Sequence, residues 1–113
     1  MLVPIVLAAA LHSPAACAEE VFDIRIENRS VPVTGDTVRV SEGDLVVLRW
    51  HTDEPVTLHL HGYDIEIRAL PDRSVETRLE TFASGRFPIT SHGFGDADGH
   101  GHRTLMYLEV LPR

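Results

Sequence analysis

Hydrophobic residues after residue 20 recur at every second position, in short runs that turn residues separate. Side chains alternate between the two faces of a β-strand, whereas a helix repeats about every 3.6 residues, so this pattern predicts strands. In segment 21–27, for example, Phe22, Ile24 and Ile26 alternate with charged residues. No helical period continues for long anywhere in this part of the chain. We therefore expect a protein built from strands.

The expected strands number seven or eight. They are 21–27, 37–40, 45–50, 56–61, 63–69, 75–81, 86–90 and 104–111. The 113 residues suffice for one domain. Short strands at this spacing are typical of sandwiches and Greek-key barrels. The expected fold class is therefore all-β, a Greek-key β-sandwich.

The N-terminal segment has the pattern of an export signal. Residues 2–11 are an apolar run, and Ala16, Cys17 and Ala18 follow it as an A-x-A-like cleavage site. We expect a signal peptide over 1–18 and a domain over 19–113 that is periplasmic or secreted. The usual positive n-region is missing, and the run is short for a membrane span, so no span is expected in the mature chain. A lipidated Cys17 is the alternative, which Pro14 disfavours.

Composition narrows the possible partners. The only cysteine is Cys17, so residues 19–113 contain neither a disulfide nor a thiolate ligand. The net charge is −7, and all ten basic residues are arginines. This negative excess argues against binding to nucleic acid or to anionic membranes, and it mildly favours cations.

Histidines are the main candidates for a functional site. Five of the six histidines in residues 19–113 form two groups: His59 and His61, and His92, His100 and His102. The first pair lies two residues apart on a predicted strand, so both side chains share one face. In the second group, His92 directly precedes a glycine-rich segment, 93–102, and His100 and His102 lie within it. This segment is expected to be a loop whose backbone could bend around an ion. Since imidazole is the commonest protein ligand for borderline transition metals, we predict one metal site from these five residues. The alternative is a solvated strand face and loop.

Other polar residues receive simpler interpretations. Asp96 and Asp98 are expected to keep the loop soluble rather than to bind metal, and His51 is expected to be structural or exposed. Met106 is expected in the core. Asp64 could orient a ligand imidazole through its second nitrogen, although a turn residue is the simpler interpretation. No arrangement of nucleophile, base and acid is recognisable, and neither is a phosphate-binding glycine loop.

Three segments resemble motifs of cupredoxins, the small copper-binding β-sandwiches. Residues 38–48 read V-x-V-x-x-G-D-x-V-x-L and residues 108–112 read L-x-V-x-P. Residues 82–87 read F-A-S-G-R-F, which resembles the F-x-x-x-G-x-Y/F turn of the family with one residue fewer before the glycine. A histidine-bearing strand stands between the first two motifs, where cupredoxins place their first copper-binding histidine. The resemblance covers essentially all of 19–113. Segment 58–62 also resembles the H-x-H-G of multicopper oxidases. The resemblance implies a cupredoxin-like fold and copper as the metal.

The chain departs from cupredoxins at the copper ligands. By the spacing of these motifs, the copper-binding cysteine of cupredoxins falls at Ser91 and the axial methionine falls near Thr104. A blue-copper centre with two histidines and a cysteine is therefore excluded by chemistry. Imidazole with oxygen suits Cu(II), which precedes Zn(II) in the Irving–Williams order, and zinc is the second possibility.

These features lead to one expected function and two alternatives. We expect a copper-binding protein for binding, carriage or buffering of Cu(II), with another periplasmic copper-handling protein as a possible partner. The first alternative is a mononuclear copper enzyme with oxidative or superoxide chemistry, although nothing identifies a substrate. The second is a cupredoxin fold that has lost its metal and serves as an interaction module. A binding protein is expected ahead of an enzyme.

Overall fold

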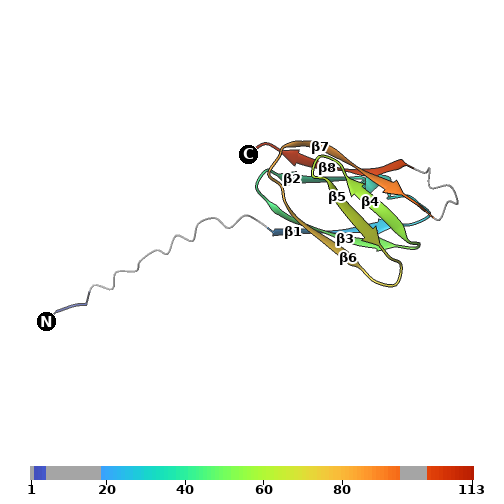
Figure 1. Ribbon diagram of the computed structural model, residues 1–113. Coiled ribbons are helices and arrows are strands. Elements are labelled where there is room, and N and C mark those ends of the chain that lie inside the picture. The colour runs from blue at the N-terminus through green and yellow to red at the C-terminus, as the bar shows by residue number, and fades with distance from the viewer. Residues whose placement is uncertain (1, 5–18, 95–101) are drawn as a thin grey trace.

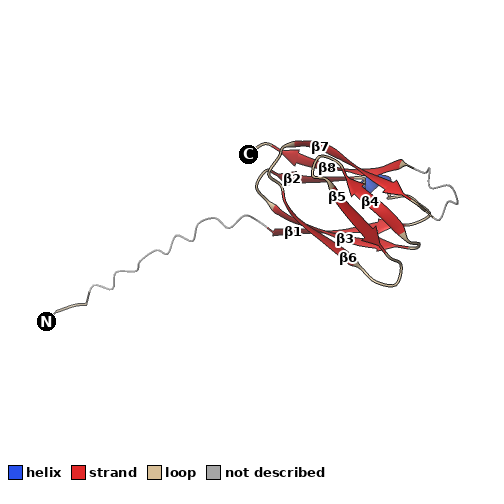
Figure 2. Cartoon of the chain, in the orientation of Figure 1, coloured by secondary structure: helices blue, strands red, loops and turns tan. Residues whose placement is uncertain are grey.

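Eight strands form two sheets in the computed structural model, which describes residues 2–4, 19–94 and 102–113 (Figure 1). The strands are β1 (Glu19–Ile26), β2 (Thr37–Ser41), β3 (Leu45–Thr52), β4 (Val56–Leu60), β5 (Ile65–Ala69), β6 (Val75–Glu80), β7 (Gly85–His92) and β8 (Arg103–Leu111). One sheet has the order β1-β3-β6 and the other β2-β8-β7-β4-β5. Within the described residues, the 3-10 turn η1 (Val33–Gly35) is the single helical element, and Figure 2 shows strands joined by loops and turns elsewhere. The predicted all-β sandwich is confirmed.

The hydrophobic core lies between the two sheets. In β1, the alternation predicted from the sequence turns Ile24 and Ile26 inward, and both are buried. In β3, Leu48 and Trp50 are fully buried, and the Trp50 indole donates a hydrogen bond to Thr77 Oγ1 at 3.1 Å. Burying each such side chain stabilises the fold by about 1.5–3 kcal/mol.

Among the described residues, no helix is long and apolar enough to cross a membrane.

The turn between β2 and β3 explains the G-D part of the first motif. Gly43 has a φ of 93°, a left-handed conformation that glycine adopts at little cost. The buried carboxylate of Asp44 accepts a hydrogen bond from the Ser41 amide at 3.1 Å and one from the Arg113 guanidinium at 3.0 Å. The motif therefore closes a turn and fastens the C-terminal end of the chain, so its role here is structural.

Strand β4 occupies the position that matters for the histidines. It pairs antiparallel with β5 on one side and with β7 on the other. In this register His59 lies opposite Glu66 of β5 and opposite Thr90 of β7, and Thr57 lies opposite His92. The predicted strand 86–90 ends too early, because pairing with β4 extends β7 as far as His92.

Candidate metal centre

The histidines of β4 and β7 lie on the outer face of the five-stranded sheet. Leu58 and Leu60 of β4 are fully buried, so His59 between them points away from the core. Ser91 of β7 is likewise fully buried, and its neighbour His92 therefore points outward. His61 follows β4 directly, and its backbone amide donates a hydrogen bond to the Pro88 carbonyl at 3.1 Å.

Four imidazole rings form a continuous chain on this face. The ring centroids of His61 and His59 are 4.3 Å apart, those of His59 and His92 are 6.4 Å apart, and those of His92 and His102 are 4.0 Å apart. His102 immediately precedes β8. The structure therefore brings together four of the five predicted ligands, from three separate segments. His100, the fifth, lies outside the described residues, as do Asp96 and Asp98.

Polar partners hold three of these rings. The Nε2 atom of His59 lies 3.2 Å from Asp64 Oδ1, the contact considered for Asp64 from the sequence. Thr90 Oγ1 lies 3.0 Å from His61 Nε2 and 3.5 Å from His92 Nε2.

In this conformation, no three His, Cys, Asp or Glu side chains within 2–4, 19–94 and 102–113 form a group that could hold a metal ion. Metal binding by the described residues alone would therefore require at least one ring to turn.

The electrostatics of the cluster favour a neutral His92. Partial burial of the ring lowers the pKa of His92 below its ordinary value of 6.5, and the neighbouring His102, His59 and His61 lower it further, whereas Glu66 opposes them. A neutral imidazole is the form that binds a metal. His92 is therefore ready to act as a ligand at pH 7 without first releasing a proton.

A hollow of approximately 460 Å³ opens beside the chain of rings. Its lining residues are Thr57, His59, Glu66, His92 and Gly93. Glu66 was not among the site residues predicted from the sequence. The alternation in segment 63–69 was visible, but the position of Glu66 opposite His59 depends on the register between β4 and β5, which the four-residue turn between them sets.

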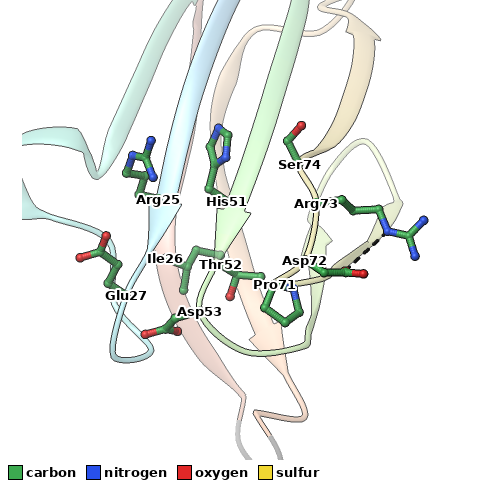
Figure 3. A pocket seen from close by; sticks show the side chains of 10 residues that line it. All are labelled: Arg25, Ile26, Glu27, His51, Thr52, Asp53, Pro71, Asp72, Arg73 and Ser74. Atoms are coloured by element: carbon green, nitrogen blue, oxygen red, sulfur yellow. Dashed lines mark ion pairs between the residues drawn. The ribbon is translucent and has the colours of Figure 1, made fainter.

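A second hollow, of approximately 330 Å³, lies elsewhere and shares no residue with the first (Figure 3). It is lined by Arg25, Ile26, Glu27, His51, Thr52, Asp53, Pro71, Asp72, Arg73 and Ser74. His51 Nε2 lies 2.9 Å from Asp23 Oδ1, which agrees with the expected structural role of His51. Since three basic side chains and three carboxylates line this hollow, its charges are mixed and indicate no class of ligand.

Ser91, the residue that motif spacing predicts at the place of the copper-binding cysteine, faces the core. Ser91 is fully buried, and its hydroxyl donates a hydrogen bond to the Arg103 carbonyl at 3.3 Å. Thr104, near the place of the axial methionine, is exposed. Met106 is buried in the core, as expected. The histidine cluster therefore lies on the opposite face of β7 from the side chain of residue 91.

No family model matches the chain, and no curated protein matches it. Solved structures do match, among them the Blue Copper Oxidase from Nitrosomonas europaea, with 18% identity and a TM-score of 0.66, covering 85% of this chain and 40% of that one. A Cu-containing nitrite reductase from Thermus scotoductus SA-01 has 17% identity and a TM-score of 0.61, covering 85% of this chain and 28% of that one.

A smaller protein matches over most of its own length. The periplasmic domain of subunit II of cytochrome oxidase of Bradyrhizobium japonicum has 13% identity and a TM-score of 0.60, covering 81% of this chain and 83% of that one. By contrast, the chain spans less than half the length of the two copper enzymes. At these identities the similarity extends to the fold alone. The predicted resemblance is thereby confirmed at the level of the fold: this chain is a cupredoxin-like β-sandwich.

Proposed function

We propose that this cupredoxin-fold protein is exported and binds Cu(II) through the histidines on the outer face of its five-stranded sheet. Its role is carriage or buffering of copper in the periplasm or outside the cell. The observation that carries the proposal is the chain of four rings, His61, His59, His92 and His102, contributed by segments far apart in sequence. His100 is a further expected ligand, from the segment outside the described residues.

The donor set fits copper in its oxidised form. Imidazole nitrogen and carboxylate oxygen suit Cu(II), and Cu(II) binds such sites more tightly than Zn(II) does. Residues 19–113 contain no cysteine, so a strongly coloured thiolate bond is impossible there. Export is inferred from the apolar run and cleavage pattern of residues 1–18.

The present hydrogen bonds of the rings do not prevent metal binding. Releasing His61 or His92 from Thr90 costs about 0.5–1.5 kcal/mol for each bond. A dissociation constant of about 1 μM corresponds to about 8 kcal/mol of binding free energy. The free-energy cost of breaking these hydrogen bonds is therefore small compared with the free energy of binding a metal ion at this affinity.

Alanine substitution of single histidines tests the proposal. His61→Ala and His92→Ala should each lower the Cu(II) affinity at least about tenfold, or about 1.4 kcal/mol, because each removes one ligand. Their melting temperatures without metal should match that of the parent, because these side chains lie outside the core. Competition titrations with protein that carries no histidine tag measure the affinities, and thermal unfolding without metal measures the melting temperatures.

His51→Ala is the matched control. His51 also sits on a strand and contacts an aspartate, but it lies in the three-stranded sheet, so its removal should leave the Cu(II) affinity unchanged. If His61→Ala and His92→Ala both bind copper like the parent, the shared site does not exist, and the interaction module becomes the better proposal.

A mononuclear copper enzyme is the second candidate function. The hollow beside His59 and His92 favours it, because an open position next to a metal gives a small molecule access to that metal. Superoxide dismutase and oxidase assays on copper-loaded protein distinguish the two candidates. Activity in the parent that His92→Ala abolishes would place the enzyme first.

A further inference from the structure

Glu66 of β5 is a carboxylate beside the histidine chain. It stands opposite His59 in the β4–β5 ladder, and directly opposite residues have Cβ atoms about 4.5–5.5 Å apart. It lines the same hollow as His59 and His92. Its negative charge also acts on His92. An anionic oxygen therefore borders the hollow that two imidazoles share.

The described residues leave this carboxylate available. Glu66 is exposed and forms no hydrogen bond or ion pair within the described part of the chain. Arg68 lies two residues further along the same face of β5, yet its guanidinium donates to Thr57 Oγ1 at 3.1 Å instead. Asp64, the other nearby carboxylate, is already bonded to His59. Glu66 is thus a free oxygen donor beside the rings.

We infer that Glu66 becomes an oxygen ligand of the metal site when the rings of His59 and His92 turn from their present partners toward it, and that it makes the site select Cu(II) over Cu(I). This inference rests on the proposed function and specifies its donor set and its cargo. A carboxylate is a hard, anionic ligand and favours the more highly charged ion, whereas Cu(I) prefers soft sulfur donors. The thioether of Met106 is buried in the core and does not reach this face.

Selection of one oxidation state bears on the role of the protein. A site that holds Cu(II) much more tightly than Cu(I) gives its bound copper a low reduction potential, so the copper stays in the oxidised form. Such behaviour suits carriage or buffering of the oxidised ion better than repeated electron transfer. Glu66 therefore determines which form of copper the protein carries.

The substitution Glu66→Gln tests this inference, because it keeps the size of the side chain and removes its charge. The Cu(II) affinity should fall at least about tenfold, while the Cu(I) affinity should change less than about threefold. A tenfold loss for Cu(II) alone raises the one-electron reduction potential of the bound copper by about 59 mV. The copper hyperfine coupling in the electron paramagnetic resonance spectrum should change as well, because an oxygen ligand is lost.

Glu80→Gln is the matched control, because Glu80 is an exposed carboxylate on β6 of the other sheet. It changes the net charge equally and should leave both affinities unchanged. Glu66→Asp, which retracts the carboxylate by one methylene, should retain more Cu(II) affinity than Glu66→Gln. Melting temperatures without metal verify that each variant is folded.

The outcomes separate this inference from the proposed function. If the parent binds Cu(II) and Glu66→Gln binds it equally well, Glu66 is not a ligand, whereas the proposed function stands. Equal losses for Cu(I) and Cu(II), or an equal loss in Glu80→Gln, overturn the selectivity. If the parent itself binds no Cu(II), the proposed function fails and this inference fails with it.

Discussion

Gly62 connects the histidine pair to an aromatic cluster at the end of the sheet. Its φ is +85°, and a Cβ atom at this position would overlap the Phe87 ring. Tyr63 follows, with its ring centroid 5.0 Å from that of Phe87 and 4.9 Å from that of Phe82, and its hydroxyl donates to the Ala83 carbonyl at 2.7 Å. A side chain at residue 62 would therefore strain the backbone and displace packed aromatic rings.

We expect Gly62→Ala to lower the free energy of unfolding by about 2–4 kcal/mol, from backbone strain and overpacking together. For a domain of this size the melting temperature should fall by at least about 10 °C, which calorimetry measures. Gly35→Ala is the control, because its Cβ would meet no atom within 4 Å and its backbone is not left-handed. A melting temperature of Gly62→Ala within about 2 °C of the parent would contradict this account.

At the scale of elements, the turn after β1 holds both described flanks of segment 95–101. The Arg29 guanidinium pairs with Glu54 at 2.7 Å, donates to the Phe94 carbonyl and lies 5.5 Å from the centroid of the Phe94 ring. The Arg103 guanidinium in turn donates to the Arg29 carbonyl at 3.1 Å. Phe94 follows His92 closely, and Arg103 follows His102. This turn therefore helps to keep the imidazole rings of His92 and His102 in contact.

Arg29→Ala should consequently weaken the contact between His92 and His102 and lower the Cu(II) affinity several-fold. Cross-relaxation between the two rings in nuclear magnetic resonance spectra, together with a copper titration, measures both effects. Arg25→Ala removes an arginine of the same charge from β1 and should alter neither measurement. If the ring contact and the affinity persist in Arg29→Ala, the turn does not position the site.

The sequence predicted the individual strands well, but it did not predict which strands pair with each other or in what register. Alternation identified the inward residues of β1 and β4 correctly, because it depends only on the strand itself. The end of β7 was placed too early, because the polar residues Ser91 and His92 resemble a turn until β4 pairs with them. The order of the strands and the irregularity between Ile89 and Thr90 depend on contacts between distant segments, which no local pattern encodes.

The same division applies to the candidate site. Residue type and spacing singled out the histidines, and the structure places four of them in one chain of ring contacts. Thr90 and Glu66 escaped the sequence analysis, since each flanks His59 only through the register of β4 with its neighbours. Motif spacing predicted that Ser91 takes the place of the copper-binding cysteine, but it could not show that this side chain faces the core while the histidines face outward.

At the scale of the whole molecule, the proposed ligands join parts of the chain that lie far apart in sequence. His59 belongs to β4, His92 ends β7, and His102 immediately precedes β8. An ion held by all three would bind the folded protein and not the unfolded chain. Copper binding should therefore stabilise the entire sandwich rather than a single loop.

The stabilisation follows from mass action. With free Cu(II) about a thousandfold above the dissociation constant, the free energy of unfolding should rise by about 4 kcal/mol. For a domain of this size, the melting temperature should then rise by about 15–30 °C, and a chelator should reverse the rise. Scanning calorimetry with and without copper measures it, and His92→Ala should lose most of the gain while His51→Ala keeps it. A parent protein that binds copper yet melts at the same temperature would show that the ion also binds the unfolded chain equally well, so the ligands would not depend on the fold to bring them together.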